Sequence, residues 1–298
     1  MHLSSALPLS AAYTAIEIAQ LVAVIQSTLP STPLSVLRYG GVSPADATRY
    51  LEARTRKGLA DSSRLPRITA MGHDGEGSTV VRNEEVVVRD RDVSSGAGEE
   101  GRSQGLIIAH ASWRYYPSYS SEAAQSSAGA ATNGSLSSTS DPDQLAFKQS
   151  DDADAGEFPP GGNKALHAHL VSRVNAAMDA VFEGLPCFVL QQISTLTPAY
   201  VRRGIASTLM RWIEPFADSD SSPFRMPVVL AASPLGYPLY RKCGYEEVRG
   251  KHGVVRIDMG EWGGRGEHKH VLMVRWPQCP EEAMDERWRR WKKRQEQE

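Results

Sequence analysis

Apolar residues recur at helical spacing in the first part of the chain. Between residues 11 and 26 they fall every three or four positions, which predicts an amphipathic helix that Pro30 and Pro33 end. Ser43 followed by Pro44 is typical of a helix start, and this second helix should run to about Thr55. A strand is expected ahead of both helices.

The middle of the chain shows two strand patterns and then a helix pattern. Residues 85–89 and 105–116 are rich in β-branched and aromatic side chains, which predicts an antiparallel pair joined by a polar loop at about 89–104. A helix should cover about 163–183, with Asn163 as its cap and Gly184 at its end. His167 and His169 point to different faces of this helix, which favours surface histidines over a shared metal.

Strands and helices alternate again in the last part of the chain. Strands are expected at 187–196, 227–232, about 245–249 and 270–276, with a short helix at about 235–243. A helix that starts near Gly204 should be kinked in its last turn by Pro215. From residue 281 the pattern is that of a charged helix, which we expect to dock on the body through Trp288 and Trp291. A helix that binds a partner is the alternative.

One long stretch, 118–160, lacks the apolar residues that a core needs. Residues 118–140 hold nine serines and one large aliphatic residue, Leu136, and an acidic run and a Pro-Pro-Gly-Gly run follow. Burial cannot offset the ordering entropy of such a segment, so we expect disorder. The stretch is either an insertion within one domain or a linker between two.

Composition narrows the class of protein. With 33 basic and 35 acidic side chains the net charge is -2, which argues against a strongly basic binder of nucleic acid. The cysteines Cys187, Cys243 and Cys279 are too few and too scattered for a disulfide framework or a metal site, and they favour a reducing compartment. We recognise no membrane span and no targeting peptide, so we expect a cytoplasmic or nuclear protein without a membrane partner.

The segment 196–207 lies between a predicted strand and a predicted helix. A tight turn into a helix N-terminus directs backbone N–H groups and the positive end of the helix dipole at one place, which suits a pyrophosphate. Gly204 and Ala206 are small at alternate positions, and Arg202 and Arg203 add positive charge. The segment has neither a Walker A Gly-Lys-Ser/Thr nor a G-x-G-x-x-G turn. An ordinary strand–helix turn is the alternative interpretation.

The order strand, Pro-x-x-x-Arg-Arg-Gly-Ile-Ala, amphipathic helix, strand and then Leu239-Tyr240-Arg-Lys-Cys-Gly244-Tyr245 resembles a known family. It is similar to the acetyl-CoA-binding core of the GNAT superfamily of acyl-CoA-dependent N-acetyltransferases, most of all to small fungal-type members. The family pattern is Q/R-x-x-G-x-G/A followed by Y-x-x-x-G-F. The likeness is strongest over about 187–248, and the order of the preceding elements agrees with it.

The resemblance implies an α/β fold of GNAT type, with a mixed, mostly antiparallel central sheet of six to seven strands flanked by helices. Because the family's element order continues on both sides of 118–160, this stretch is expected to be a disordered insertion. The expected organisation is thus a single GNAT-like domain over 1–280, interrupted at 118–160, and a charged C-terminal helix over 281–298.

The resemblance also implies roles for individual residues. Tyr240 would be the general acid that protonates the leaving thiolate, because a phenol is protonated at neutral pH. The strand before the turn would offer backbone groups to the pantetheine and thioester at Ser194, Thr195 and Leu196, and Ser233 would lie near the pantetheine. The pyrophosphate loop would consist of Arg202, Arg203, Gly204, Ile205, Ala206 and Ser207.

The expected function is transfer of an acetyl group from acetyl-CoA, as co-substrate and without a metal, to a primary amine of a small molecule or peptide. Strand 227–232 carries no carboxylate that would act as a base, so a water chain or an acid such as Glu85 is expected to serve. His110 and Trp113 either line the acceptor pocket or belong to the core or surface. A catalytically degenerate module that binds acyl-CoA or a partner is the alternative function, and a scaffold that uses the Ser-rich stretch is a weaker one.

Overall fold

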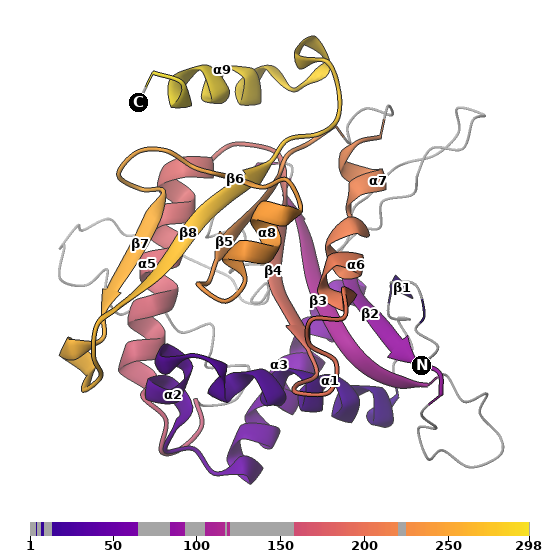
Figure 1. The fold of residues 1–298 in the computed structure, drawn as a ribbon, viewed down its shortest axis with the longest axis vertical. Helices are drawn as coiled ribbons and strands as arrows, with labels where there is room; N and C mark the ends of the chain where they lie inside the picture. The colour runs from indigo at the N-terminus through magenta and orange to yellow at the C-terminus, as the bar shows by residue number, and fades with distance from the viewer. Residues whose placement is uncertain are drawn as a thin grey trace, which may run out of the picture.

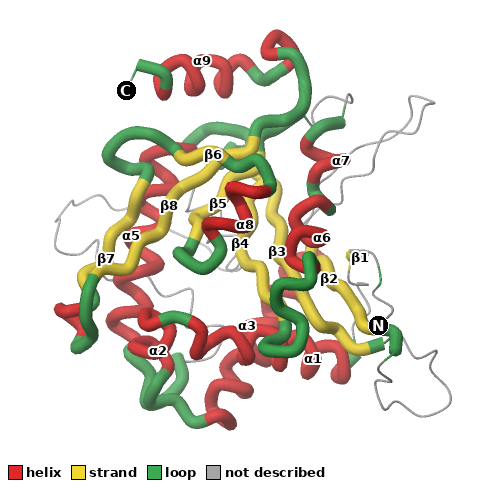
Figure 2. Tube along the Cα trace, in the orientation of Figure 1, coloured by secondary structure: helices red, strands yellow, loops and turns green. Residues whose placement is uncertain are grey.

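The structure is a computed structural model that describes residues 4, 7–8, 14–64, 84–92, 105–116, 118–119, 158–219 and 225–297. One mixed β-sheet runs through these residues, and helices lie on both of its faces (Figure 1, Figure 2). The helices are α1 Ala15–Thr28, α2 Pro33–Tyr39, α3 Pro44–Arg64, α5 Lys164–Phe182, α6 Ile205–Arg211, α7 Glu214–Ala217, α8 Tyr237–Lys242 and α9 Glu286–Gln295. Over the ranges described, no helix is both long enough and apolar enough to cross a membrane.

The sheet is antiparallel except at one position. Its strands are β1 Leu7–Pro8, β2 Glu84–Asp90, β3 Leu106–Tyr116, β4 Cys187–Thr195, β5 Val228–Ala232, β6 Glu246–Glu247, β7 Val254–Asp258 and β8 Glu267–Arg275. Their order is β1-β2-β3-β4-β5-β8-β6, and β7 pairs with β8 outside this path. Among the strand pairs of the described residues, only β4 and β5 run parallel. The predicted class, a mixed and mostly antiparallel sheet flanked by helices, is confirmed.

Hydrophobic cores lie on both faces of the sheet. On one face, Ala109, Ala111 and Trp113 of β3 alternate along the strand and pack with Ile205 of α6 and Tyr240 of α8. On the other face, one core surrounds α5 and α9 and a second lies beneath α1 and α3. In Figure 1, α6 and α8 accordingly lie in front of the sheet and α5 lies behind it. We call these the α8 face and the α5 face.

Local signals set the helix ends. The Thr14 hydroxyl accepts the Glu17 N–H at 3.1 Å, and the Glu17 carboxylate accepts the Thr14 N–H at 2.7 Å, so a capping box starts α1. Asn163 accepts the Leu166 N–H at 2.9 Å, which confirms the predicted cap of α5. The helix expected to be kinked at Pro215 is divided into α6 and α7.

Three elements differ from the expectation. Pro33 opens α2, because Thr32 caps this helix and proline suits its first position. Helix α3 continues to Arg64, well past the expected end near Thr55. Strand β7 is absent from the sequence-based expectation, and its pairing with β8 runs along all five of its residues.

The expected surface position of His167 is wrong. Its side chain is only 5% exposed, and its ring stacks on Phe158 with the centroids 4.9 Å apart. Phe158 and Tyr119 lie inside the stretch 118–160, yet both are buried. The boundaries of the insertion were therefore too wide, because these aromatic residues belong to the core. Residues 120–157 lie outside the described part of the chain.

The C-terminal helix α9 docks on the α5 face, as predicted. Trp288 and Trp291 are buried, and their indole N–H groups donate to the carbonyls of Pro186 at 2.6 Å and Val181 at 2.8 Å. The two tryptophans of this charged helix thus pack in the core around Phe182.

Candidate functional site

The parallel strands β4 and β5 separate at the centre of the sheet. Their pairing comprises Phe188 with Val228 and Val189 with Val229. Beyond this point β4 continues to pair with β3, and β5 continues to pair with β8. The two strands therefore turn their inner edges, with the backbone N–H and C=O groups on them, towards a gap.

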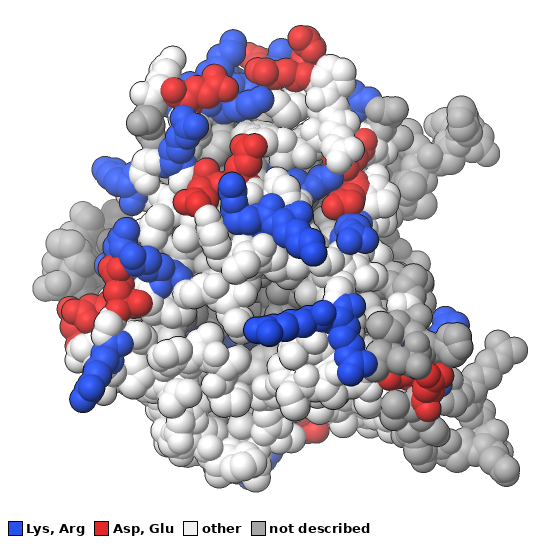
Figure 3. Space-filling model, viewed as in Figure 1, with Lys and Arg blue, Asp and Glu red and all other residues white. Residues whose placement is uncertain are grey.

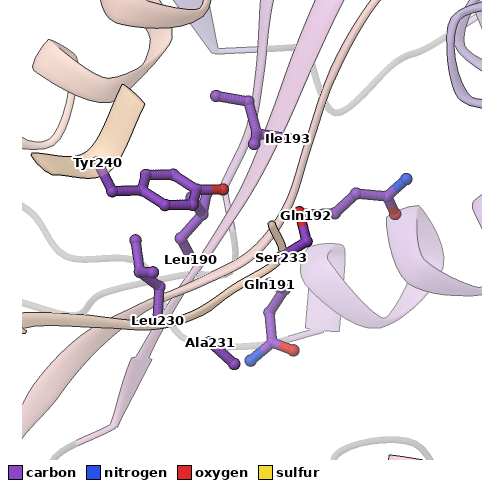
Figure 4. Close-up of a pocket in the computed structure, with 8 residues that line it drawn as sticks. All are labelled: Leu190, Gln191, Gln192, Ile193, Leu230, Ala231, Ser233 and Tyr240. Atoms are coloured by element: carbon purple, nitrogen blue, oxygen red, sulfur yellow. The ribbon is translucent and has the colours of Figure 1, made fainter. Parts of the chain in front are cut away.

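A cavity of about 180 Å³ occupies this gap. Residues from both strands and from α8 line it, as Figure 4 shows. They are Leu190, Gln191, Gln192, Ile193, Leu230, Ala231, Ser233 and Tyr240. The fold thus brings Ser233 and Tyr240, two residues predicted from the sequence, to the same cavity.

Tyr240 closes the cavity on the α8 face. Its ring lies among the cavity residues with the hydroxyl directed between Ile193 and Ser233 (Figure 4). A Cβ atom on Gly236 would lie 2.7 Å from Cε2 of Tyr240 and 3.1 Å from its hydroxyl, so the ring needs a glycine there. Burial raises the pKa of Tyr240 well above its usual value, and the phenol therefore stays protonated at neutral pH.

Ser233 forms the turn that starts α8. Its hydroxyl accepts the Gly236 N–H at 3.3 Å, and its carbonyl accepts the Tyr237 N–H at 2.9 Å. This turn holds Ser233 at the end of β5 while the following helix carries Tyr240 back over the gap. The two residues are therefore placed by the same short segment.

The backbone of β4 alternates between its two neighbours. The Leu196 N–H donates to the Ile108 carbonyl of β3 at 2.7 Å, and the Leu196 carbonyl accepts the Tyr200 N–H at 3.2 Å. Since N–H directions alternate along a strand, the amides of Ser194 and Leu196 face β3 and those of Ile193 and Thr195 face the gap. The N–H of Leu196 is thus bound within the sheet, and that of Ser194 faces β3 as well. The roles of Ser194, Thr195 and Leu196 toward a pantetheine stay predictions.

A bulge lies in β4 beside the gap. Ser112 lies opposite Gln192 and Trp113 opposite Leu190, so Gln191 is an extra residue in β4. Sequence reasoning missed six of the residues that line the cavity: Leu190, Gln191, Gln192, Ile193, Leu230 and Ala231. Strand alternation indicates the facing of Ile193 once the neighbours of β4 are known, but nothing local in the sequence marks the bulge.

The loop that was predicted to bind pyrophosphate follows β4 after the connecting residues 196–201. Arg202 and Gly204 both have left-handed backbone, with φ of 63° and 80°, and α6 begins at Ile205. Glycine adopts this conformation at low cost, which explains its place before the helix. Residues 202–207 do not line the cavity itself; they lie at the end of the strand that does.

Two contacts anchor this loop to distant parts of the chain. Thr197 donates its N–H to the Ser27 hydroxyl at 3.2 Å and its own hydroxyl to the Ser27 carbonyl at 2.7 Å. The Tyr200 hydroxyl donates to the Asp90 carboxylate at 3.0 Å in a buried contact. The Arg203 guanidinium lies 5.8 Å from the centroid of the Tyr200 ring. These hydrogen bonds hold in place the segment that carries Arg202 and Arg203.

Positive charge surrounds the opening of the site on the α8 face. Figure 3 shows Lys and Arg side chains on both sides of a hollow, over α8 and over the loop that precedes α6. The exposed cations of these two segments are Arg202, Arg203, Arg241 and Lys242. Such a rim attracts anionic ligands even though the whole chain is close to neutral.

The remaining candidates take different places. Trp113 is 1% exposed, belongs to the core on the α8 face and is not among the residues that line the cavity. His110 is buried on the opposite face of β3, in register with Ser194. Glu85 lies in β2 opposite Ser112, and its role as a base stays a prediction. In the part of the chain that the structure describes, no three His, Cys, Asp or Glu side chains form a group that would hold a metal.

Comparison with known proteins gives distant matches. No family model matches the chain, and no curated protein does. Among solved structures, a histone acetyltransferase HPA2 and related acetyltransferase from Corynebacterium glutamicum is 16% identical, with a TM-score of 0.43 over 93% of this chain and 97% of its own.

Two further matches among solved structures are Naa20 and NAA60. Naa20 from Chaetomium thermophilum, in complex with a bisubstrate analogue, is 14% identical, with a TM-score of 0.30 over 64% of this chain and 65% of its own. NAA60 from Arabidopsis thaliana, in complex with acetyl-CoA, is 14% identical, with a TM-score of 0.31 over 79% and 96%. At TM-scores below 0.5 we derive nothing from these likenesses, and the function is inferred from the site itself.

Proposed function

We propose that this protein is a GNAT-type acetyltransferase that moves an acetyl group from acetyl-CoA to a primary amine. The observation that carries the proposal is the cavity between the separated strands β4 and β5, closed by the protonated Tyr240. The sequence pattern from Arg202 to Tyr245 is the independent support.

The gap suits the extended, amide-bearing pantetheine arm. A chain with amide groups can bind to free strand edges as an added strand does, through backbone hydrogen bonds. Ile193 and Thr195 direct their N–H groups to that gap. The loop 202–207 and the cationic rim would hold the phosphates, since left-handed Gly204 leaves open space above the backbone: a Cβ there would meet nothing within 4 Å.

The residues of the site match the needs of direct transfer. The neutral amine attacks the thioester carbonyl carbon, and a backbone N–H of β4 stabilises the negative charge on its oxygen. When the C–S bond breaks, the Tyr240 hydroxyl gives its proton to the leaving sulfur, and the proton lost by the amine goes to water or to a base. The protein contributes chiefly by holding the two reactants in place.

Release of free CoA tests the proposal. The purified chain is incubated with acetyl-CoA and a panel of primary amines, including peptides, and thiol formation is followed with an aromatic disulfide reagent. We expect amine-dependent release that Tyr240→Phe reduces strongly. Absence of release with every amine, together with normal CoA binding, would reject catalysis.

One observation favours a second candidate, a degenerate module that binds acyl-CoA without turnover. The described residues that line the cavity include no Asp or Glu. Calorimetry separates the two, because the degenerate module would bind acetyl-CoA and CoA yet release no thiol with any amine.

A further inference from the structure

Two neighbouring glutamines line the cavity from the middle of the sheet. Strand β4 lies between β3 and β5, and its first four residues, up to Leu190, are buried and apolar. Gln191 is then exposed and Gln192 half-buried, and both belong to the residues that line the cavity. A strand that is buried on both faces usually continues as an apolar run. The change to two polar side chains therefore coincides with the space that a ligand would fill.

The side-chain amides of these two glutamines are available to a ligand. Neither forms a hydrogen bond with any residue that the structure describes. Other glutamines of the chain have structural partners. Gln20 accepts the N–H of Ile107 at 3.0 Å, and Gln295 accepts a backbone N–H at 2.8 Å. Each amide at the cavity thus offers a carbonyl acceptor and two N–H donors.

The strand register places the glutamines on the α5 side of the gap. Gln192 lies opposite Ser112 of β3, whose neighbour Trp113 belongs to the core on the α8 face. Because successive side chains alternate, Ser112 and Gln192 take the α5 face. Gln191 extends from the bulge towards Ala231 of β5 (Figure 4), and Ala231 packs against the core around α5. The two amides thus adjoin the gap from the side opposite α8.

The glutamines come directly before a backbone group that faces the proposed thioester donor. The N–H of Ile193 is directed to the gap, and the Tyr240 hydroxyl is directed to the same region from the α8 face (Figure 4). With the donor held there, an acceptor amine reaches the thioester carbonyl from the α5 side. A group attached close to that amine then lies beside Gln191 and Gln192.

We propose that Gln191 and Gln192 bind an uncharged carboxamide next to the acceptor amine, so that the substrates are amino amides. A carboxamide complements a glutamine side chain, because each offers a carbonyl acceptor together with N–H donors. The polar side chains of the described lining residues are all uncharged: the two amides, the Ser233 hydroxyl and the protonated Tyr240 hydroxyl. Burying a carboxylate or a second ammonium among such groups costs far more than burying an amide. This inference rests on the proposed function for the identity of the reaction.

Acceptors that differ in one group test the inference. Alaninamide is compared with alanine methyl ester, in which an ester oxygen replaces the amide nitrogen, and with alanine, which carries a carboxylate. Release of CoA gives kcat/KM for each acceptor. We expect the value for the amide to exceed that for the ester about tenfold, because the ester lacks the N–H donors and leaves a glutamine carbonyl unpaired. Alanine should be the poorest of the three, because its charge is buried without a counter-charge.

Substitution of both glutamines tests whether they cause this preference. The double variant Gln191→Leu/Gln192→Leu should bring the amide-to-ester ratio close to one, because leucine has a similar size and no hydrogen-bonding group. Gln278→Leu is the matched control, since Gln278 is exposed outside the cavity lining and its loss should preserve the ratio. If circular dichroism shows that the double variant does not fold, the two single variants are measured, and an unchanged ratio in both would overturn the inference.

Other outcomes separate this inference from the proposed function. Equal use of amide and ester by the wild type, or a ratio that survives in the double variant, would overturn the carboxamide site while catalysis stands. If no amine releases CoA, NMR of the CoA complex decides instead. Side-chain N–H signals of Gln191 and Gln192 that shift with alaninamide and not with the ester would support the site, and signals that stay in place would overturn it.

Discussion

The missing side chain at Gly236 decides where the ring of Tyr240 lies. A methyl group at this position would overlap the ring, whereas the glycine lets α8 bring the hydroxyl to the cavity. At the other end of the site, Gly204 serves a different purpose: it adopts left-handed backbone in open space. Gly236 thus leaves room for the Tyr240 ring at the cavity, and Gly204 leaves open space above the loop backbone.

Tyr240→Phe removes the proposed proton donor and little else. Because the phenol is buried and its pKa is raised, it is protonated throughout the neutral range, and its loss should lower kcat by about 10²- to 10⁴-fold. Calorimetric CoA affinity should stay nearly the same. Full activity in this variant would mean that the thiolate leaves without help from Tyr240.

Gly204→Glu tests the phosphate loop. The glutamate adds a negative charge where phosphates are proposed to bind, and CoA affinity should fall about tenfold or more, in line with loss of a charge-assisted contact. Gly204→Asn is the matched control, since asparagine tolerates left-handed backbone and adds no charge. A similar CoA affinity in both variants would remove the assignment of phosphate binding to this loop.

At the scale of elements, the site depends on a loop whose position is set elsewhere. The segment from Thr197 to Gly204 is held by Ser27 at the end of α1 and by Asp90 at the end of β2. The separation of β4 from β5 also depends on whole elements, because β4 continues along β3 while β5 continues along β8. Neither feature belongs to any one residue of the site.

Tyr200→Phe should loosen the loop. The variant leaves the buried Asp90 carboxylate without its hydroxyl donor, which costs about 1–3 kcal/mol of stability in urea unfolding. The KM for acetyl-CoA should rise several-fold, while kcat at saturating acetyl-CoA should change little. Tyr237→Phe is the control, because it removes a hydroxyl contact with Glu247 at the surface. An unchanged KM in Tyr200→Phe would show that the anchor does not position the loop for CoA.

At the scale of the whole molecule, segments far apart in the chain complete shared cores. Phe158 packs with Tyr39 of α2 and Tyr50 of α3, and Tyr119 packs with Phe182 of α5. The tryptophans of α9 join the same core as Phe182. Tyr119, Phe158 and the C-terminal helix thus contribute to these cores.

Two deletions test where the core ends. Replacing 121–156 with about 12 Gly/Ser residues, which span about 20 Å as coil, should change stability by about 1 kcal/mol or less and preserve CoA affinity. Replacing 118–160 in the same way also removes Tyr119 and Phe158, and loss of one such buried aromatic costs about 3–5 kcal/mol. Urea unfolding measures both. Equal stability of the two variants would place these aromatics outside the core, and loss of CoA binding in the shorter deletion would show that 121–156 contributes to the domain.

The sequence by itself determined most helices and strands, since periodicity and caps depend on neighbours along the chain. The stripe of α5, the cap at Asn163 and the turn at Gly204 are of this kind, and the motif from Arg202 to Tyr245 led to Tyr240 and Ser233. Only the tertiary structure decided which strands lie side by side, and therefore where β4 and β5 separate and which backbone groups face the gap. The contact of the buried His167 with Arg38 joins residues more than a hundred positions apart, which no local pattern records.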